Sequence, residues 1–81
     1  MSKKIKISIA KYVYDSGTTG IRWEKVKEKL DLKDEELYVF TSKGKLSDLV
    51  FIDIDYIGDK TLIPYEKLYY MNHSEIETYF E

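Results

Sequence analysis

The sequence contains no cysteine and no glutamine, and only one histidine, one arginine and one proline among its 81 residues. Without cysteine there is no disulfide framework, no thiolate metal site and no cysteine nucleophile. His73 has no sequence neighbour that could orient it as a general base, so a loop or helix-capping role is expected. A glycine-rich phosphate-binding loop is also missing. These absences argue against an enzyme, and we expect a protein that acts by binding without a cofactor.

Long apolar stretches are absent as well. No run approaches the ~18 residues of a membrane span. The segment Met1-Ser2-Lys3-Lys4 lacks the apolar core of a secretory signal. We therefore expect no membrane association and a cytoplasmic location. The length fits one domain over residues 1–81, at a size where a single core is just sufficient.

Lysine is abundant in the chain, and side-chain amides are scarce. Twelve lysines accompany the single arginine, Arg22, and Asn72 is the only asparagine. Enrichment in Lys and Glu with few thermolabile amides is typical of hyperthermophile proteins, which favours an archaeon or one of its viruses or plasmids. AT-rich codon usage in a mesophile or its phage predicts the same composition, so both sources stay open.

The net charge of −2 conceals two oppositely charged halves. Residues 1–33 carry nine cations against four acids, which gives +5, and residues 34–81 carry four cations against eleven acids, which gives −7. Such asymmetry can mark a nucleic-acid face opposite an acidic face, or it can reflect ordinary solvated surface.

Hydrophobic spacing predicts some elements clearly and leaves the first one open. Residues 3–15 fit either a strand or a helix, because isoleucines alternate while Ile5, Ile9 and Val13 also recur at helical spacing. Residues 23–30 predict a helix with an apolar stripe. Residues 49–63 predict a hairpin with a two-residue Gly58-Asp59 turn.

The remaining segments are less uniform. Asp34-Glu35-Glu36 is typical of a first helical turn, whereas Leu37–Thr41 has high strand propensity and Gly44 interrupts a long helix. Beyond Pro64 the sequence predicts a short helix over 65–71. A second helix is expected to open at Ser74 in a capping box with Glu77.

The order of these segments suggests a known fold. Residues 13–32, VYDSGTTGIRWEKVKEKLDL, follow a course of helix end, glycine turn, single bridge residue, helix and Leu-x-Leu turn. Residues 46–64 resemble the end of a recognition helix that runs into a wing. Over about residues 3–72 the chain resembles the winged helix-turn-helix DNA-binding family. The resemblance implies an α+β fold, duplex DNA as partner and a role in transcription regulation.

The chain departs from that family at the expected recognition helix. Asp31 stands where the family usually has glycine, and Lys33 stands where it has a Ser or Thr cap, although Asp34 could serve as the cap. The helix would open on Asp34-Glu35-Glu36, and carboxylates at that position repel the phosphate backbone.

If the domain binds DNA, its attraction should come from lysines and from hydroxyls at the end of the recognition helix, with Lys60 at the wing tip. The expected nucleic-acid contacts are Lys3, Lys4, Lys6, Lys25, Lys29, Thr41, Ser42, Lys43, Lys45 and Lys60. Ordinary surface charge is the alternative interpretation of each lysine. The pair Asp53 and Asp55 could hold a hard cation, but it fits a solvated strand face better.

The C-terminal half suggests a second function. Tyrosine and methionine are enriched at interface cores. We expect a homodimer or partner interface formed by Tyr65, Tyr69, Tyr70, Met71, Tyr79 and Phe80. The alternative to DNA binding is therefore a protein-binding module or small viral or plasmid inhibitor with an acidic, Tyr-rich surface.

The protein-binding alternative also leaves a second fold open. In the protein-binding interpretation, residues 35–63 could form a three-stranded antiparallel meander packed on two or three helices. The conformation of Leu37–Thr41 decides the matter: a helix there supports the winged fold, and an extended segment removes it.

Overall fold

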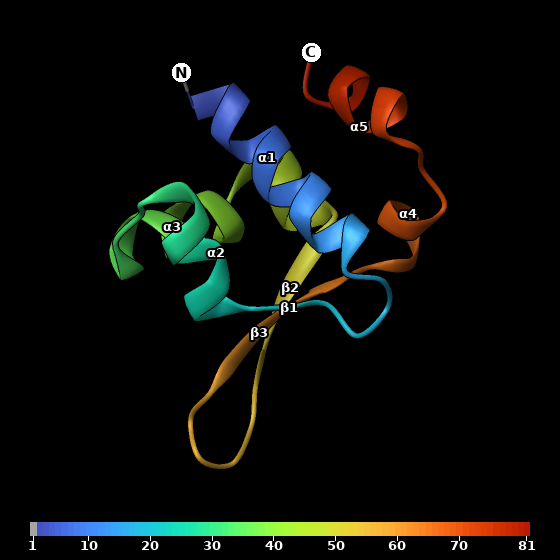
Figure 1. Ribbon diagram of the computed structural model, residues 1–81. Helices are drawn as coiled ribbons and strands as arrows, with labels where there is room; N and C mark the ends of the chain where they lie inside the picture. The colour runs from blue at the N-terminus through green and yellow to red at the C-terminus, as the bar shows by residue number, and fades with distance from the viewer. Residues whose placement is uncertain (1) are drawn as a thin grey trace.

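The computed structural model describes residues 2–81, which form a small α+β domain with a three-stranded antiparallel sheet. Its order of elements is compatible with a winged helix-like fold (Figure 1). The elements are α1 (Ser2–Asp15), β1 (Ile21–Arg22), α2 (Trp23–Leu30), α3 (Asp34–Ser42), the 3-10 helix η1 (Gly44–Asp48), β2 (Val50–Ile54), β3 (Lys60–Pro64), α4 (Glu66–Tyr69) and α5 (His73–Tyr79). Every helix within residues 2–81 is too short or too polar to span a bilayer.

The first segment is a helix, because its apolar residues meet the core at helical spacing. Ile9, Ala10 and Val13 on α1 are fully buried. A strand would have placed the neighbours Ile9 and Ala10 on opposite faces, whereas a helix brings all three residues to one side. Figure 1 shows α1 crossing the middle of the molecule, between the sheet and α5.

The segment that decides the fold is also helical. Leu37 and Thr41 are both buried and lie one turn apart on α3, so the meander alternative is wrong. Gly44 does not interrupt this helix, because α3 ends at Ser42. With a φ of +67°, Gly44 instead begins η1 in a conformation that favours glycine.

The hairpin over residues 49–63 is confirmed, but its turn is longer than predicted. Strand pairing runs from Val50 opposite Pro64 to Ile54 opposite Lys60, which leaves residues 55–59 as a five-residue loop. The side chain of Asp55 accepts the main-chain N–H of Ile57 at 3.0 Å and that of Asp59 at 2.9 Å. This carboxylate therefore closes the loop, a role that a two-residue turn would not need.

The third strand and the last helix complete the fold. Ile21 and Arg22 pair with Leu62 and Thr61, so β3 lies between β1 and β2. Ser74 is not the cap of α5, because that helix is capped two residues earlier. Asn72 Oδ1 accepts the N–H of Glu75 at 2.8 Å.

One core joins all these elements. It contains Ile9, Ala10, Val13, Trp23, Val26, Leu37, Leu46, Leu49, Val50, Leu62, Leu68, Ile76 and Phe80. Residues near both ends of the described chain belong to it, from Ile9 on α1 to Phe80 after α5. The surface positions discussed below are therefore held on a single packed framework.

Candidate functional site

The start of α3 is fixed by a buried tryptophan. Trp23 is 2% exposed, and its indole N–H donates to Asp34 Oδ1 at 2.9 Å. Lys27 Nζ lies 2.9 Å from the same oxygen. The hydrogen bond from Lys27, and after it the one from Trp23, lower the pKa of Asp34 below its usual range. The first acid of α3 is therefore satisfied within the domain.

The next two acids of α3 differ from Asp34 and from each other. Glu36 Oε1 accepts the main-chain N–H of Lys33 at 2.9 Å, which satisfies one free donor at the helix start. Asp34 is not the cap, because it lies inside the first turn and Lys33 occupies the cap position. Within residues 2–81, the side chain of Glu35 makes no hydrogen bond or ion pair, and Glu36 has no cationic partner.

The outer side of α3 is apolar beside these acids. Tyr38 is 58% exposed and Val39 is 50% exposed. Glu35, Glu36, Val39 and Phe40 line a shallow hollow on the helix surface. We call Glu35, Glu36, Tyr38, Val39 and Phe40 the α3 face. No residue of α3 is basic, so the helix at the recognition position presents carboxylates, apolar groups and hydroxyls but no cation.

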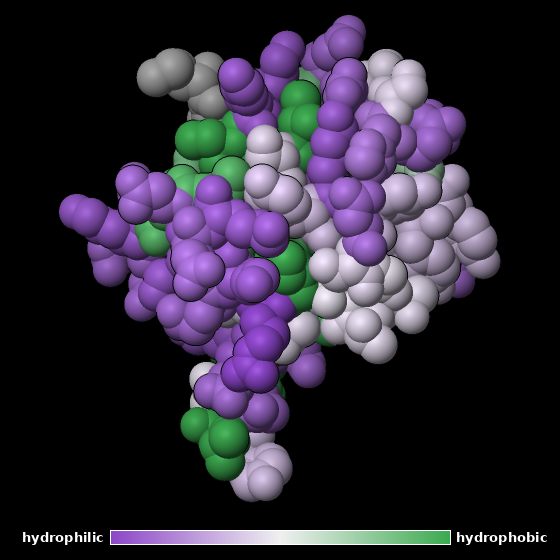
Figure 2. All heavy atoms as spheres, in the orientation of Figure 1, coloured by the Kyte–Doolittle hydropathy of each residue, from purple (hydrophilic) through white to green (hydrophobic). Residues whose placement is uncertain are grey.

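The hairpin end exposes a second apolar set. Ile54 is 59% exposed, Tyr56 99% and Ile57 68%. Figure 2 shows the resulting hydrophobic patch at the far end of the projecting hairpin. Lys60 begins β3 directly after the loop, opposite Ile54, and its ammonium lies 5.2 Å from the centre of the Trp23 ring. That contact draws the side chain back towards α2.

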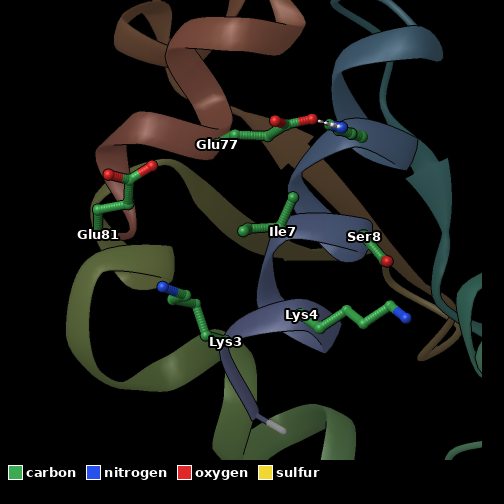
Figure 3. Close-up of a pocket in the computed structure, with 7 residues that line it drawn as sticks. Lys3, Lys4, Ile7, Ser8, Glu77 and Glu81 are labelled. Carbon is green, nitrogen blue, oxygen red and sulfur yellow. Dashed lines mark hydrogen bonds and ion pairs between the residues drawn. The ribbon is translucent and has the colours of Figure 1, made fainter.

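The predicted lysines separate into groups. Lys3, Lys6 and Lys45 line one hollow with Gly44 and Phe80. Lys3 also lines a neighbouring hollow together with Lys4 and Lys11. Figure 3 shows Lys3 and Ile7 on the side of α1 that faces α5, whereas Lys4 and Ser8 point away from it. We call Lys3, Lys4, Lys6 and Lys45 the lysine end.

Acids from α5 and the residues after it moderate the charge of the lysine end. Glu77 and Glu81 line the same hollow as Lys3 and Lys4. Glu77 forms an ion pair with Lys11, and this contact lowers the pKa of the Glu77 carboxyl. Lys45 Nζ donates to the main-chain oxygen of Glu81 at 2.9 Å. The N-terminal excess of cations is thus partly neutralised by the folded C-terminal segment.

The other predicted contacts of α2 and α3 have mixed outcomes. Lys25, Lys29, Ser42 and Lys43 are exposed, and the Lys29 ammonium lies 5.3 Å from the centre of the Tyr12 ring. Thr41 is only 4% exposed, and its hydroxyl donates to the carbonyl of Leu37 at 2.8 Å. The prediction that Thr41 reaches a base edge or phosphate is therefore wrong, because the side chain is packed inside the domain.

The C-terminal aromatic residues are also divided. Phe80 is 8% exposed and belongs to the core, so its predicted interface role is wrong. Tyr79 is held within the chain, since its hydroxyl accepts from Lys67 at 3.0 Å. Tyr69 and Met71 are half-buried. Tyr65 and Tyr70 are 45% and 76% exposed, so a dimer interface of the predicted kind would depend mainly on these two.

One cluster could not be read from residue spacing. His73 Nε2 lies 2.7 Å from Asp15 Oδ1, and Tyr14 packs edge-on against the His73 ring. These residues are too far apart in sequence for a pattern to pair them. Within residues 2–81 no three His, Cys, Asp or Glu side chains gather as metal ligands, and Asp55 serves the hairpin loop.

The fold and the surface define a class: a small α+β domain of winged helix-like order, whose third helix presents an acidic and apolar face. Comparison with protein-family profiles, curated protein sequences and solved structures found no match to this chain.

Proposed function

We propose that this chain is a protein-binding module and that the α3 face is its contact surface. The observation that supports this most directly is the composition of the exposed part of α3. A winged helix that reads DNA brings this helix to the major groove, where carboxylates repel phosphates. Here three acids and no cation occupy the helix, while Tyr38 and Val39 stay exposed.

Exposed apolar groups on a small domain point to a partner of protein character. Monomeric proteins rarely leave contiguous apolar patches open, and those they leave are commonly interaction sites. Aromatic side chains are enriched in the buried centres of protein interfaces, and a charged rim favours a complementary partner. The α3 face combines Tyr38 and Phe40 with the carboxylates of Glu35 and Glu36.

Affinity capture with matched variants tests the proposal. The wild-type chain, Val39→Asp and Lys25→Ala would each be used as bait in extracts of the cells that encode the chain. Val39 lies on the α3 face and Lys25 is exposed on α2, so Lys25→Ala controls for a surface change elsewhere. We expect proteins that are retained by wild type and Lys25→Ala and lost with Val39→Asp. Equal recovery with all three baits would contradict the proposal.

A second candidate is binding of duplex DNA at the lysine end. It is favoured by the gathering of Lys3, Lys6 and Lys45 around one hollow. Log affinity for DNA falls with log salt concentration, and each phosphate contact that a lysine makes steepens this fall by about 0.9. Replacing these three lysines by alanine should therefore reduce the slope by up to about 3. The pair Lys25→Ala and Lys29→Ala is the control, and affinity that is independent of salt would exclude this candidate.

A further inference from the structure

The α3 face has the chemistry of a helix-docking surface. Val39 follows Glu35, and Phe40 follows Glu36, by four residues, which is about one helical turn. Each apolar side chain therefore lies beside an acid on the same side of the helix, and all four line one hollow. The result is an acidic row, Glu35 and Glu36, towards the start of α3 and an apolar row, Val39 and Phe40, towards its end.

The charges of this face are not balanced from within the domain. Asp34 is paired with Lys27, but the described residues 2–81 provide no cation to Glu35 or Glu36. First-turn acids do stabilise a helix through its dipole. That effect does not account for Val39, which remains half exposed beside them. A partner with cations next to apolar side chains would complement both rows.

The backbone of α3 restricts the form of such a partner. Within a helix the main-chain groups bond to one another, so α3 offers an occupant side chains but no free strand edge. The occupant therefore pairs no backbone groups with α3 and must satisfy them within itself or with water. An amphipathic helix does so and packs its ridges into the grooves of another helix.

We propose that the α3 face binds a basic amphipathic helix of a partner protein. Apolar side chains of that helix enter the hollow at Val39 and Phe40, and its lysines or arginines pair with Glu35 and Glu36. This inference rests on the proposed function and specifies the chemistry of the partner segment.

Anisotropy titrations with a designed peptide test this inference. The probe is a labelled amphipathic helical peptide built only from leucine and lysine, titrated with the whole chain. The matched peptide carries glutamate in place of lysine. We expect saturable, salt-sensitive binding of the lysine peptide and none of the glutamate peptide, because only the former complements Glu35 and Glu36.

Paired variants locate the site. Val39→Asp should weaken the lysine peptide at least about tenfold, whereas Ile57→Asp on the hairpin tip should leave affinity unchanged. Glu35→Gln should weaken binding about threefold and lower its salt sensitivity, and Glu28→Gln on α2 should do neither. Circular dichroism of each variant checks that it is folded. If Val39→Asp fails to fold, the comparison of Glu35→Gln with Glu28→Gln tests the inference.

Several results would overturn the inference. One is equal affinity for Glu35→Gln and Glu28→Gln, and another is comparable binding of both peptides. A labelled DNA duplex that binds wild type and is weakened by Val39→Asp would assign the face to nucleic acid instead. If the peptide does not bind while Val39→Asp still loses a captured protein, this inference fails and the proposed function stands. If Val39→Asp captures the same proteins as wild type, both fail.

Discussion

At the scale of single residues, Gly20 is fixed by the strand beside it. Its φ is +78°, and an added Cβ would overlap the carbonyl oxygen of Leu62 and lie 2.9 Å from Ile63 Cδ1. Gly17 has a similar φ of +77° but open space around it. The two glycines thus share a conformational constraint and differ only in their contacts.

Alanine substitutions should separate these two effects. We expect Gly17→Ala to lower the free energy of unfolding by about 1–2 kcal/mol, the cost of a left-handed non-glycine residue. Gly20→Ala should cost at least about 2 kcal/mol more, because β3 must also shift to relieve the overlap. Urea unfolding midpoints at unchanged m-value measure both costs. Equal losses for the two variants would show that the contact with Leu62 is unimportant.

Asp34 gives the domain a pH-dependent contribution to stability. Lys27 and Trp23 lower its pKa in the folded state. A depressed carboxyl pKa stabilises the fold above the unfolded value of about 3.9, and this stabilisation is lost as the pH falls through the folded value. Asp34→Asn keeps the acceptor for Trp23 and removes the charge. Its unfolding midpoint should be below that of wild type at pH 7, and the difference should disappear in acid.

The control for this prediction is an acid without a partner. Glu35→Gln removes a charge of the same sign from the same helical turn, where no cation within residues 2–81 contacts it. Its midpoint at pH 7 should fall less than that of Asp34→Asn, because only the contribution of the helix dipole is lost. If the unfolding midpoint of Asp34→Asn lies as far below that of wild type at low pH as at pH 7, the charge of Asp34 is excluded as the cause.

At the scale of elements, the start of α5 is fixed by reciprocal capping at Asn72. Asn72 Oδ1 accepts from Glu75, and Glu75 Oε1 accepts from the N–H of Asn72 at 3.0 Å. Asn72→Ala should cost about 1 kcal/mol of unfolding free energy. Ser74→Ala, at the position favoured by the sequence, should change it by less than about 0.5 kcal/mol. Thermal or urea unfolding of both variants checks this, and the reverse order would place the cap at Ser74.

The cap illustrates which parts of the fold the sequence could predict. The α2 helix and the hairpin follow from local periodicity, which needs no knowledge of neighbours. For α5, Asn72 with Glu75 and Ser74 with Glu77 fit a capping pattern about equally well. The choice depends on Ile76 being buried in the common core. That packing is tertiary information.

The candidate site was predictable only in part, for the same reason. The acidic opening of α3 is visible in the sequence, and its conflict with DNA binding follows from charge alone. The exposure of Val39 and the burial of Thr41 depend on which side of α3 meets the core. The return of Lys60 to Trp23 requires the spatial arrangement of α2 and the hairpin. None of these three properties can be obtained from residue spacing.

At the scale of the whole molecule, folding redistributes the charge that divides the sequence. Figure 1 places the two termini at one end and the hairpin loop at the other. Because α5 returns to α1, Glu77 reaches Lys11 and partly cancels the basic N-terminal segment. On α3 no such cancellation reaches Glu35 within residues 2–81. Glu35 and Glu36 therefore keep their charges without a cationic partner on the α3 face, where the proposals locate a partner.

The projecting hairpin should be the first part of the molecule that a protease cleaves. Tyr56 is 99% exposed in a loop beyond the paired strands, whereas the 58% exposed Tyr38 is protected within a helix. Chymotrypsin should therefore cut after Tyr56 first. The two fragments should stay together under native conditions, since each contributes core residues such as Val13 and Leu62. Timed digestion followed by native and denaturing mass spectrometry measures both outcomes. In Tyr56→Ser the first cut should move to the region of Tyr70, and an early cut at Tyr38 would instead show that α3 opens readily.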